Sequence, residues 1–247
     1  TSIGDYAFRG ANSLTSITIP NAVTTIGNGA FFGATTLTSI TIPAATTSIG
    51  AGALQGANAL TEISVNSFSQ SYSSIDGVLF DKSASVLLKY PAAKSGTSYE
   101  IPESVTSIKW RSFENAASLT AMSIPASVTD VEDFAFENAT ALTDFNFLGD
   151  APTNLAADSF AGIAAGAIAN ISAGASGFGS GPTWNGLAIN REVLITNGNY
   201  VCTTGELDLD GENSTYFIFN GVVFFLKYKE FFLVIDICYS IGHCCYK

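Results

Sequence analysis

The chain has 247 residues, of which 47% are apolar and 13% are charged. This share of apolar side chains is enough to bury a sizeable core, so the composition argues against disorder for most of the chain. Ten Lys and Arg residues against 21 Asp and Glu residues give a net charge of -11. Such a surface repels a phosphate backbone, which makes nucleic acid a poor partner.

The N-terminal part of the chain repeats itself every 23 residues. The stretch NSLTSITIP (12–20) returns as TTLTSITIP (35–43). Each copy alternates apolar and polar residues and ends in proline, which predicts a short strand that stops there because proline has no N–H for the ladder. Several columns recur together, among them Ile3, Ile26 and Ile49; Gly4, Gly27 and Gly50; Phe8, Phe31 and Leu54; Leu14, Leu37 and Leu60; and Ile17, Ile40 and Ile63.

One copy has too few large side chains to offset the entropy of ordering it, so the copies are expected to stack. Parallel strands ~4.8 Å apart would place each Leu, Ile and Phe column in one continuous core. The pattern stops at residue 67, resumes after residue 98 and decays at 155–162, where it runs one residue out of step. The predicted fold is a β-rich repeat solenoid over residues 1–190.

Two segments depart from the repeat within the solenoid. Residues 67–98 contain two apolar runs, Ile75 to Phe80 and Val86 to Tyr90, around a polar five-residue connection, which predicts an inserted β-hairpin without a ligand of its own. Residues 164–190 are rich in Gly and Ala and contain Trp184. This segment is interpreted as a C-terminal cap.

The tail, residues 191–247, has no period and packs six phenylalanines into a short span. Lys227, Lys229 and Glu230 interrupt its apolar run, which is too short for the ~20 residues of a membrane helix. Three interpretations stay open: a membrane anchor, a hydrophobic strand pair packed on the last coil, and an unrelated extension. Association with a membrane is therefore expected only through this tail.

The pattern IGxxAFxGA followed by LTSITIP, at a 23-residue period, closely resembles the BspA-like class of leucine-rich repeats. The resemblance covers about residues 1–66 and 99–163, with continuation to about 190. It implies a right-handed coil with a parallel concave sheet and short convex turns, an extracellular or cell-surface location, and a protein or matrix partner. The chain starts within the repeat register, so a longer parent protein is expected. Two columns depart from the family: alanine replaces the usual cysteine at Ala11, Ala34, Ala57, Ala116 and Ala139, and Lys109 and Glu132 replace the column glycine.

The chain has few residues that could act in catalysis or bind a metal, and their positions and spacing do not suit such a site. All four cysteines and the single histidine, His243, follow residue 200, so the repeat holds no nucleophile–imidazole pair. Cys238, Cys244 and Cys245 lack CxxC spacing, and incidental thiols are favoured over a metal site. The run Glu206, Asp208, Asp210 begins like a calcium loop, but Phe217 stands where the bidentate Glu belongs. No enzymatic activity, metal or cofactor is expected.

The outward strand positions form small, polar, mildly acidic columns that are expected to line the concave face and bind the partner. Phe32 stands where the other copies have polar residues and is expected to be an exposed anchor. Two alternatives stay open: a structural spacer array without a ligand, and a regular hydroxyl array for ice, which the acidic residues disturb. Asn138, Asn170 and Asn213 begin glycosylation sequons. The predicted partner-binding residues are Ser39, Thr41, Glu62, Ser64, Glu100, Ser123, Asp144 and Asn146.

Overall fold

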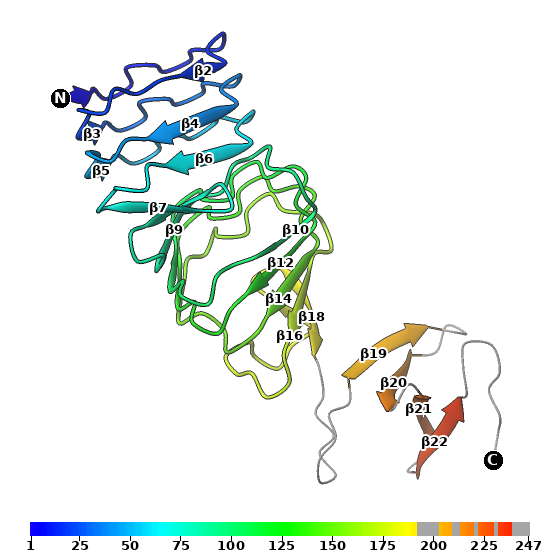
Figure 1. Ribbon diagram of the computed structural model, residues 1–247. Helices are drawn as coiled ribbons and strands as arrows, with labels where there is room; N and C mark the ends of the chain where they lie inside the picture. The colour runs from blue at the N-terminus through cyan, green and yellow to red at the C-terminus, as the bar shows by residue number, and fades with distance from the viewer. Residues whose placement is uncertain (192–202, 209–212, 220–221, 230–231, 239–247) are drawn as a thin grey trace.

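The computed structural model describes residues 1–191, 203–208, 213–219, 222–229 and 232–238. Residues 1–191 form a solenoid of about 8 turns, built from short strands and turns, and no helix occurs in the described ranges (Figure 1). The predicted repeat solenoid is therefore confirmed. An insertion divides it into two stacks of coils, named here the first block (residues 1–66) and the second block (residues 98–191).

The first block has two parallel walls, each of three strands in register at 23-residue intervals. Ser39 pairs with Glu62, and Thr25 pairs with Ser48. Leu37, Ile40 and Leu60 are buried between the walls, as the repeat pattern requires. One wall is β2 (Ser16–Ile17), β4 (Ser39–Ile42) and β6 (Glu62–Val65), and the other is β1 (Ser2–Ile3), β3 (Thr25–Ile26) and β5 (Ser48–Ile49).

The insertion is a three-stranded antiparallel unit, β7 (Tyr72–Ile75), β8 (Val78–Asp81) and β9 (Val86–Lys89). The predicted hairpin of β8 and β9 is present, but the prediction of one strand from Ile75 to Phe80 is wrong. Asp76 and Gly77 have φ values of 50° and 74°, so they form a tight hairpin turn that ends β7 and starts β8. β9 also pairs in parallel with β11, so the insertion is part of a solenoid wall.

The second block continues the coil on the other side of the insertion. Its register is 23 residues up to β14 and 24 residues from Asp144 to Ile168 and from Asp130 to Asn154, which confirms the predicted step. One wall adds β11 (Ser107–Ile108), β13 (Asp130–Val131) and β15 (Asn154–Leu155) to the insertion. The other wall is β10 (Ser98–Glu100), β12 (Ala121–Ile124), β14 (Asp144–Phe147), β16 (Ile168–Ile171), β18 (Leu187–Arg191) and the antiparallel β17 (Thr183–Trp184).

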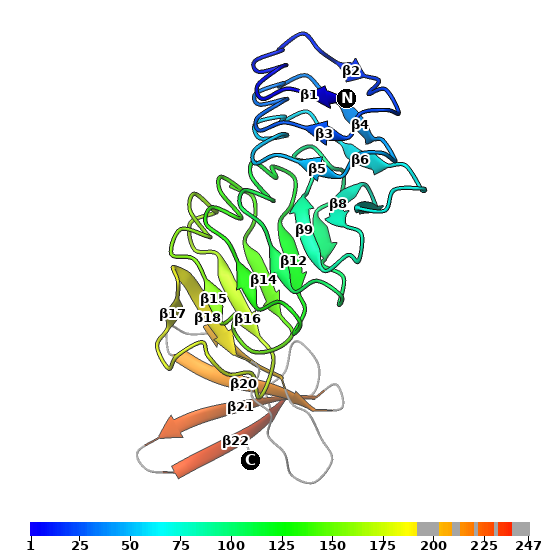
Figure 2. The ribbon, with the colours of Figure 1, turned by 90° about the vertical axis from the view of Figure 1, so that its left-hand side faces the viewer.

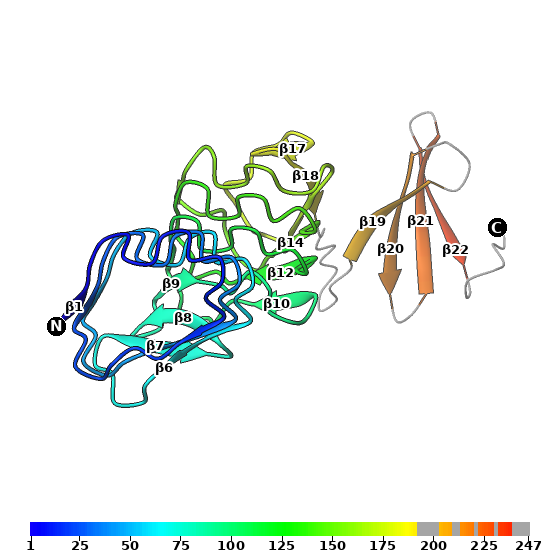
Figure 3. The same cartoon turned by 90° about the horizontal axis from the view of Figure 1, so that it is seen from above.

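The interior consists of two separate cores, one in each block. β8 contributes to both, because Leu79 packs in the first core whereas Val78 and Phe80 pack in the second. Seen along the stack, the coils of the first block superimpose and those of the second block are displaced sideways (Figure 3). In the second core, four rings follow one another at centroid distances of 5.1 to 5.3 Å: Tyr90, Phe113, Phe136 and Phe160.

The described part of the tail forms a four-stranded antiparallel sheet in the order β19 (Thr203–Asp208), β20 (Asn213–Phe219), β21 (Val222–Lys229) and β22 (Phe232–Cys238). Figure 2 draws β20, β21 and β22 in orange to red, below the coils of the solenoid. No helix within the described ranges has both the length and the hydropathy of a membrane span. Asp210, His243, Cys244 and Cys245 lie outside the described residues. The predictions about a calcium loop, incidental thiols and the single histidine therefore stay predictions.

Candidate functional site

The first four predicted binding residues lie together on the wall formed by β4 and β6. Ser39 stands beside Glu62, and Thr41 stands beside Ser64, in the parallel register of the two strands. Ile40 and Ile63 alternate with them and point into the core. Thr41 and Glu62 are exposed, whereas Ser39 and Ser64 are half-buried. These four side chains are named patch A.

The other four predicted residues lie on the corresponding wall of the second block and are named patch B. Glu100, Ser123 and Asn146 follow one another across β10, β12 and β14, and Asp144 lies two positions before Asn146. The row continues through Asn170 and Asn190, which sequence reasoning did not include. Asn170 donates to Asn146 and Asn190 donates to Asn170, both at 2.9 Å, so the three amides form a ladder. The alternation of apolar and polar residues in IANI (168–171) could have identified Asn170 as a member of this row.

The single continuous face expected from the repeat columns is not present, because patches A and B belong to different sheets. The Ile63 N–H donates to the Gly77 carbonyl at 2.8 Å, and the Ser74 hydroxyl donates to the Ile63 carbonyl at 2.5 Å. The β7–β8 turn therefore occupies the edge of β6 where the next coil would pair. The recognition surface predicted as one face is divided into two.

Phe32 is half-buried rather than freely exposed. The guanidinium of Arg9, from the preceding coil, lies 5.4 Å from the centroid of its ring. The sequence showed that Phe32 departs from a polar column. It did not show that an arginine would cover part of the ring.

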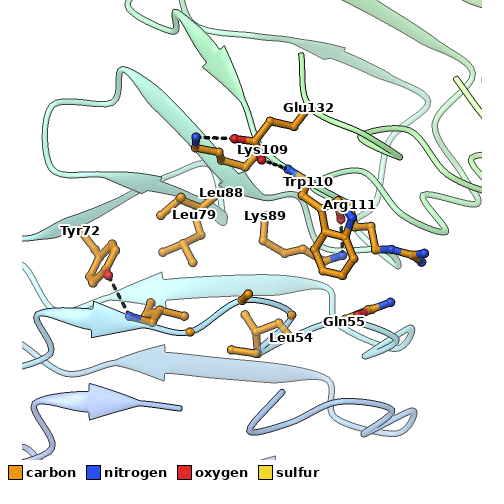
Figure 4. Close-up of a pocket in the computed structure, with 15 residues that line it drawn as sticks. Leu54, Gln55, Tyr72, Leu79, Leu88, Lys89, Lys109, Trp110, Arg111 and Glu132 are labelled. Atoms are coloured by element: carbon orange, nitrogen blue, oxygen red, sulfur yellow. Dashed lines mark hydrogen bonds and ion pairs between the residues drawn. The ribbon is translucent and has the colours of Figure 1, made fainter. Parts of the chain in front are cut away.

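A cavity of about 250 Å³ lies where the first block meets the insertion and the second block, and it is named the junction pocket (Figure 4). Leu54 comes from the last turn of the first block, and Leu79 and Leu88 come from β8 and β9. Trp110, whose side chain is partly exposed, lines the same pocket. Sequence reasoning missed this pocket, because its walls come from three segments that no shared motif connects.

The charged rim of the junction pocket occupies the column that holds glycine in the first block. A Cβ at Gly50 would lie 2.4 Å from the Asn28 nitrogen, so this coil requires glycine there. In the second block Lys109 and Glu132 replace it and form an ion pair of 2.5 Å. Glu132 also accepts a hydrogen bond of 2.8 Å from the Trp110 N–H, which fixes the start of the turn.

A buried charged cluster adjoins the junction pocket and connects the two blocks. Lys89 donates to the Arg111 carbonyl at 2.9 Å and lies 3.7 Å from the Glu114 carboxylate. Burial lowers the pKa of Lys89 to about 8, although Glu114 acts in the opposite direction. Glu114 accepts from Arg111 at 2.8 Å and from the Gly56 N–H of the first block at 3.2 Å. This carboxylate therefore holds the blocks to each other.

The junction pocket and patches A and B have features that suit binding. The junction pocket is smaller than the ~300 to 1,000 Å³ of a drug-sized ligand site and matches a single side chain or ring. Among the described residues, no three His, Cys, Asp or Glu side chains gather as metal ligands would. Patches A and B present short polar side chains on a regular backbone, which suits a broad contact with another macromolecule.

Residues 1–90 and 89–176 match the family model described as the BspA type leucine rich repeat region, in 6 copies. No curated protein matches the chain. A solved leucine rich cell surface protein from Faecalibacterium prausnitzii A2-165 is 28% identical with a TM-score of 0.57, over 80% of this chain and 58% of that one. The pneumococcal vaccine antigen PcpA is 18% identical (TM-score 0.47), over 69% of this chain and 65% of that one. A leucine rich repeat protein of T. pallidum is 25% identical (TM-score 0.40), over 58% and 61%. The chain thus spans less than two thirds of each of these structures.

Proposed function

Because this chain belongs to the BspA-type leucine-rich repeat proteins, we propose that it is a non-enzymatic recognition module at the cell surface or secreted, which binds a protein or matrix partner through patches A and B. The F. prausnitzii structure is described as a cell surface protein, which supports the proposed location. Leucine-rich repeat proteins of this type are typically non-catalytic. The proposal needs no cofactor, metal or nucleic acid.

The observation that carries the proposal is the row of polar side chains across five strands in register, which begins in patch B and continues through Asn170 and Asn190. Glu100, Ser123, Asn146, Asn170 and Asn190 stand on consecutive parallel strands, ~4.8 Å apart. Short side chains on a rigid wall lose little conformational entropy when a partner covers them. A partner can therefore bind along the row without reorganising the coil.

The asparagine ladder also favours the second candidate function, a structural spacer. The amides of Asn146, Asn170 and Asn190 bond to each other, so part of their hydrogen-bonding capacity is used within the chain. Threonines reinforce the wall in the same way: Thr61 donates to the Thr38 carbonyl at 3.0 Å, and Thr38 donates to that of Thr15 at 3.1 Å. A spacer needs such internal bonds and no ligand.

The test compares lysine substitutions on the two patches with matched substitutions on the opposite wall. The immobilised chain is exposed to matrix proteins, a bound protein is identified, and its affinity is measured by surface plasmon resonance. Thr41→Lys with Ser64→Lys (patch A) and Glu100→Lys with Ser123→Lys (patch B) are expected to weaken binding about tenfold or more, because lysine stands where the partner must approach. Ser2→Lys with Ser48→Lys, on β1 and β5, is the control. Equal affinity of all variants would reject the patches and support the spacer.

A further inference from the structure

The turns of the first block, together with Trp110 of the second block, form a shallow depression, named the aromatic slot, with a volume of about 220 Å³. Gly29 and Gly52 lie on neighbouring coils, since the Gly29 N–H donates to the Ala51 carbonyl at 3.0 Å. A Cβ placed on Gly29 would lie 2.4 Å from the Tyr6 ring, and one on Gly52 would lie 3.5 Å from the Trp110 ring. The Tyr6 ring therefore lies over Gly29, and the Trp110 ring and the Gln55 oxygen lie over Gly52, because glycine leaves room for them.

The slot exists because one column of the coil has a left-handed backbone. Tyr6, Gly29, Gly52 and Arg111 have φ values of 55°, 53°, 64° and 54°. This conformation costs a side-chain-bearing residue ~1 to 2 kcal/mol, so glycine is the residue favoured by folding. Phe134 of the second block has the same conformation, with a φ of 57°, so the left-handed backbone belongs to this turn in five coils. At Tyr6 the turn leaves the residue 54% exposed beside the slot.

The polar groups of the slot are a cation and an amide. The Arg9 guanidinium lies 5.6 Å from the Tyr6 ring centroid and 5.4 Å from that of Phe32, and it forms no ion pair with any described residue. In a chain with a net charge of -11, such a cation is conspicuous. Gln55 directs its carbonyl oxygen to within 3.1 Å of the Cβ position of Gly52, so an acceptor lies over this glycine. Its nitrogen donates to Glu114 at 3.4 Å, which fixes this orientation.

We propose that the aromatic slot binds a carboxylated sugar residue of an acidic polysaccharide. A pyranose ring has flat C–H faces that pack on aromatic rings and a rim of hydroxyl groups. Tyr6 and Trp110 supply the rings, and Gln55 accepts a hydrogen bond from a hydroxyl. Arg9 binds the carboxylate, because the planar guanidinium matches its two oxygens.

The shape of the slot favours a sugar over an acidic peptide. No leucine, isoleucine or valine lines the slot, whereas Leu54, Leu79 and Leu88 line the adjoining junction pocket (Figure 4). The volume of about 220 Å³ matches one ring unit rather than a folded partner surface. The slot is formed by turns and not by patches A and B, so this proposal stands or falls separately from the protein-binding function.

The experiment titrates the full chain, by isothermal titration calorimetry at low salt, with a hexasaccharide that contains glucuronic acid. The matched probe is the same hexasaccharide with its carboxyl groups reduced to alcohols. The acidic probe is expected to bind about tenfold or more tightly than the neutral one, because a charge-assisted hydrogen bond is lost on reduction. Arg9→Gln should remove this preference while leaving the neutral probe unaffected.

Four further variants separate the slot from general effects. Trp110→Ala should weaken both probes about tenfold, whereas Trp110→Phe should keep most of the affinity because it retains a ring. Phe68→Ala removes an aromatic ring that is 79% exposed elsewhere on the chain and should change nothing. Ser64→Lys, in patch A, should also leave sugar binding unchanged. Circular dichroism confirms that each variant is folded.

The proposal is overturned if the acidic and neutral probes bind equally, if Arg9→Gln keeps the preference, or if neither probe binds the native chain. It is also overturned if an acidic peptide binds in a Trp110-dependent manner and the hexasaccharide does not. In that case the slot is a peptide site.

Discussion

The buried Lys89 makes the stability of this protein depend on pH in an unusual direction. Burial lowers its pKa from 10.5 to about 8, so the folded chain holds this proton less tightly than the unfolded chain does. Between these two values the unfolded state binds more protons, and the free energy of unfolding therefore rises with pH. A difference of about 2.5 pKa units is worth roughly 3 kcal/mol, of which about 2 kcal/mol should be gained between pH 7 and pH 9.5.

The assay is urea denaturation at constant ionic strength across this pH range, with the native chain and Lys89→Met compared. Methionine has a similar length and no charge, so the variant should lose the rise. Lys82→Met, at an exposed lysine, is the control and should keep it. The upper limit of pH 9.5 avoids the buried tyrosines, because burial raises the pKa of Tyr90 to about 12 and that of Tyr99 further. Their ionisation would lower stability above pH 10.

The reasoning is refuted if Lys89→Met shows the same rise as the native chain. The proton would then come from another group. A flat profile of the native chain would also refute it, since Lys89 would then keep its proton equally well in the folded state, with Glu114 compensating fully for its burial.

Two further predictions concern the coil itself. Gly50→Ala should lower the free energy of unfolding by ~1 to 3 kcal/mol, because its Cβ would lie 2.4 Å from the Asn28 nitrogen, whereas Gly4→Ala meets no atom within 4 Å and should be neutral; thermal melts of both variants decide this. Phe136→Ala should cost ~3 to 5 kcal/mol, because this fully buried ring packs between Phe113 and Phe160, whereas Phe68→Ala should stay within ~0.5 kcal/mol in the same urea assay; comparable losses in both would contradict the packing argument.

The coil and its register were predictable from the sequence because every coil repeats the same packing problem. Leu37 and Leu60 must be buried in equivalent places, and the 23-residue interval fixes which strand residues become neighbours. The one-residue step after Asp144 was visible for the same reason. Columns of similar side chains in the sequence therefore indicate how the coils stack.

The insertion was predicted less well, because its sequence has no second copy for comparison. The apolar run around Asp76 and Gly77 was interpreted as one strand, although the Asp-Gly pair is itself a strong hairpin turn signal. The edge of β6 is closed by this turn, and patches A and B separate as a result. The division of the predicted face was therefore not visible from the columns.

The junction pocket and the charged cluster depend on how the insertion displaces one block against the other. Gln55 and Glu114 are 59 residues apart in the sequence and meet only at this junction. They occupy the same column of the repeat, but the insertion separates their two coils in the sequence, so the repeat pattern alone does not make them neighbours. The contact depends on how the insertion places the second block against the first.

β8 fills two interiors with consecutive residues, Leu79 on one side and Val78 and Phe80 on the other. A gain or loss of whole 23-residue units far from β8 alters neither set of contacts. Gene duplication can thus lengthen each block independently. Substitutions in β8, in contrast, must fit both cores at once. Relatives of different length are expected to vary most in unit number and least in the residues that border β8.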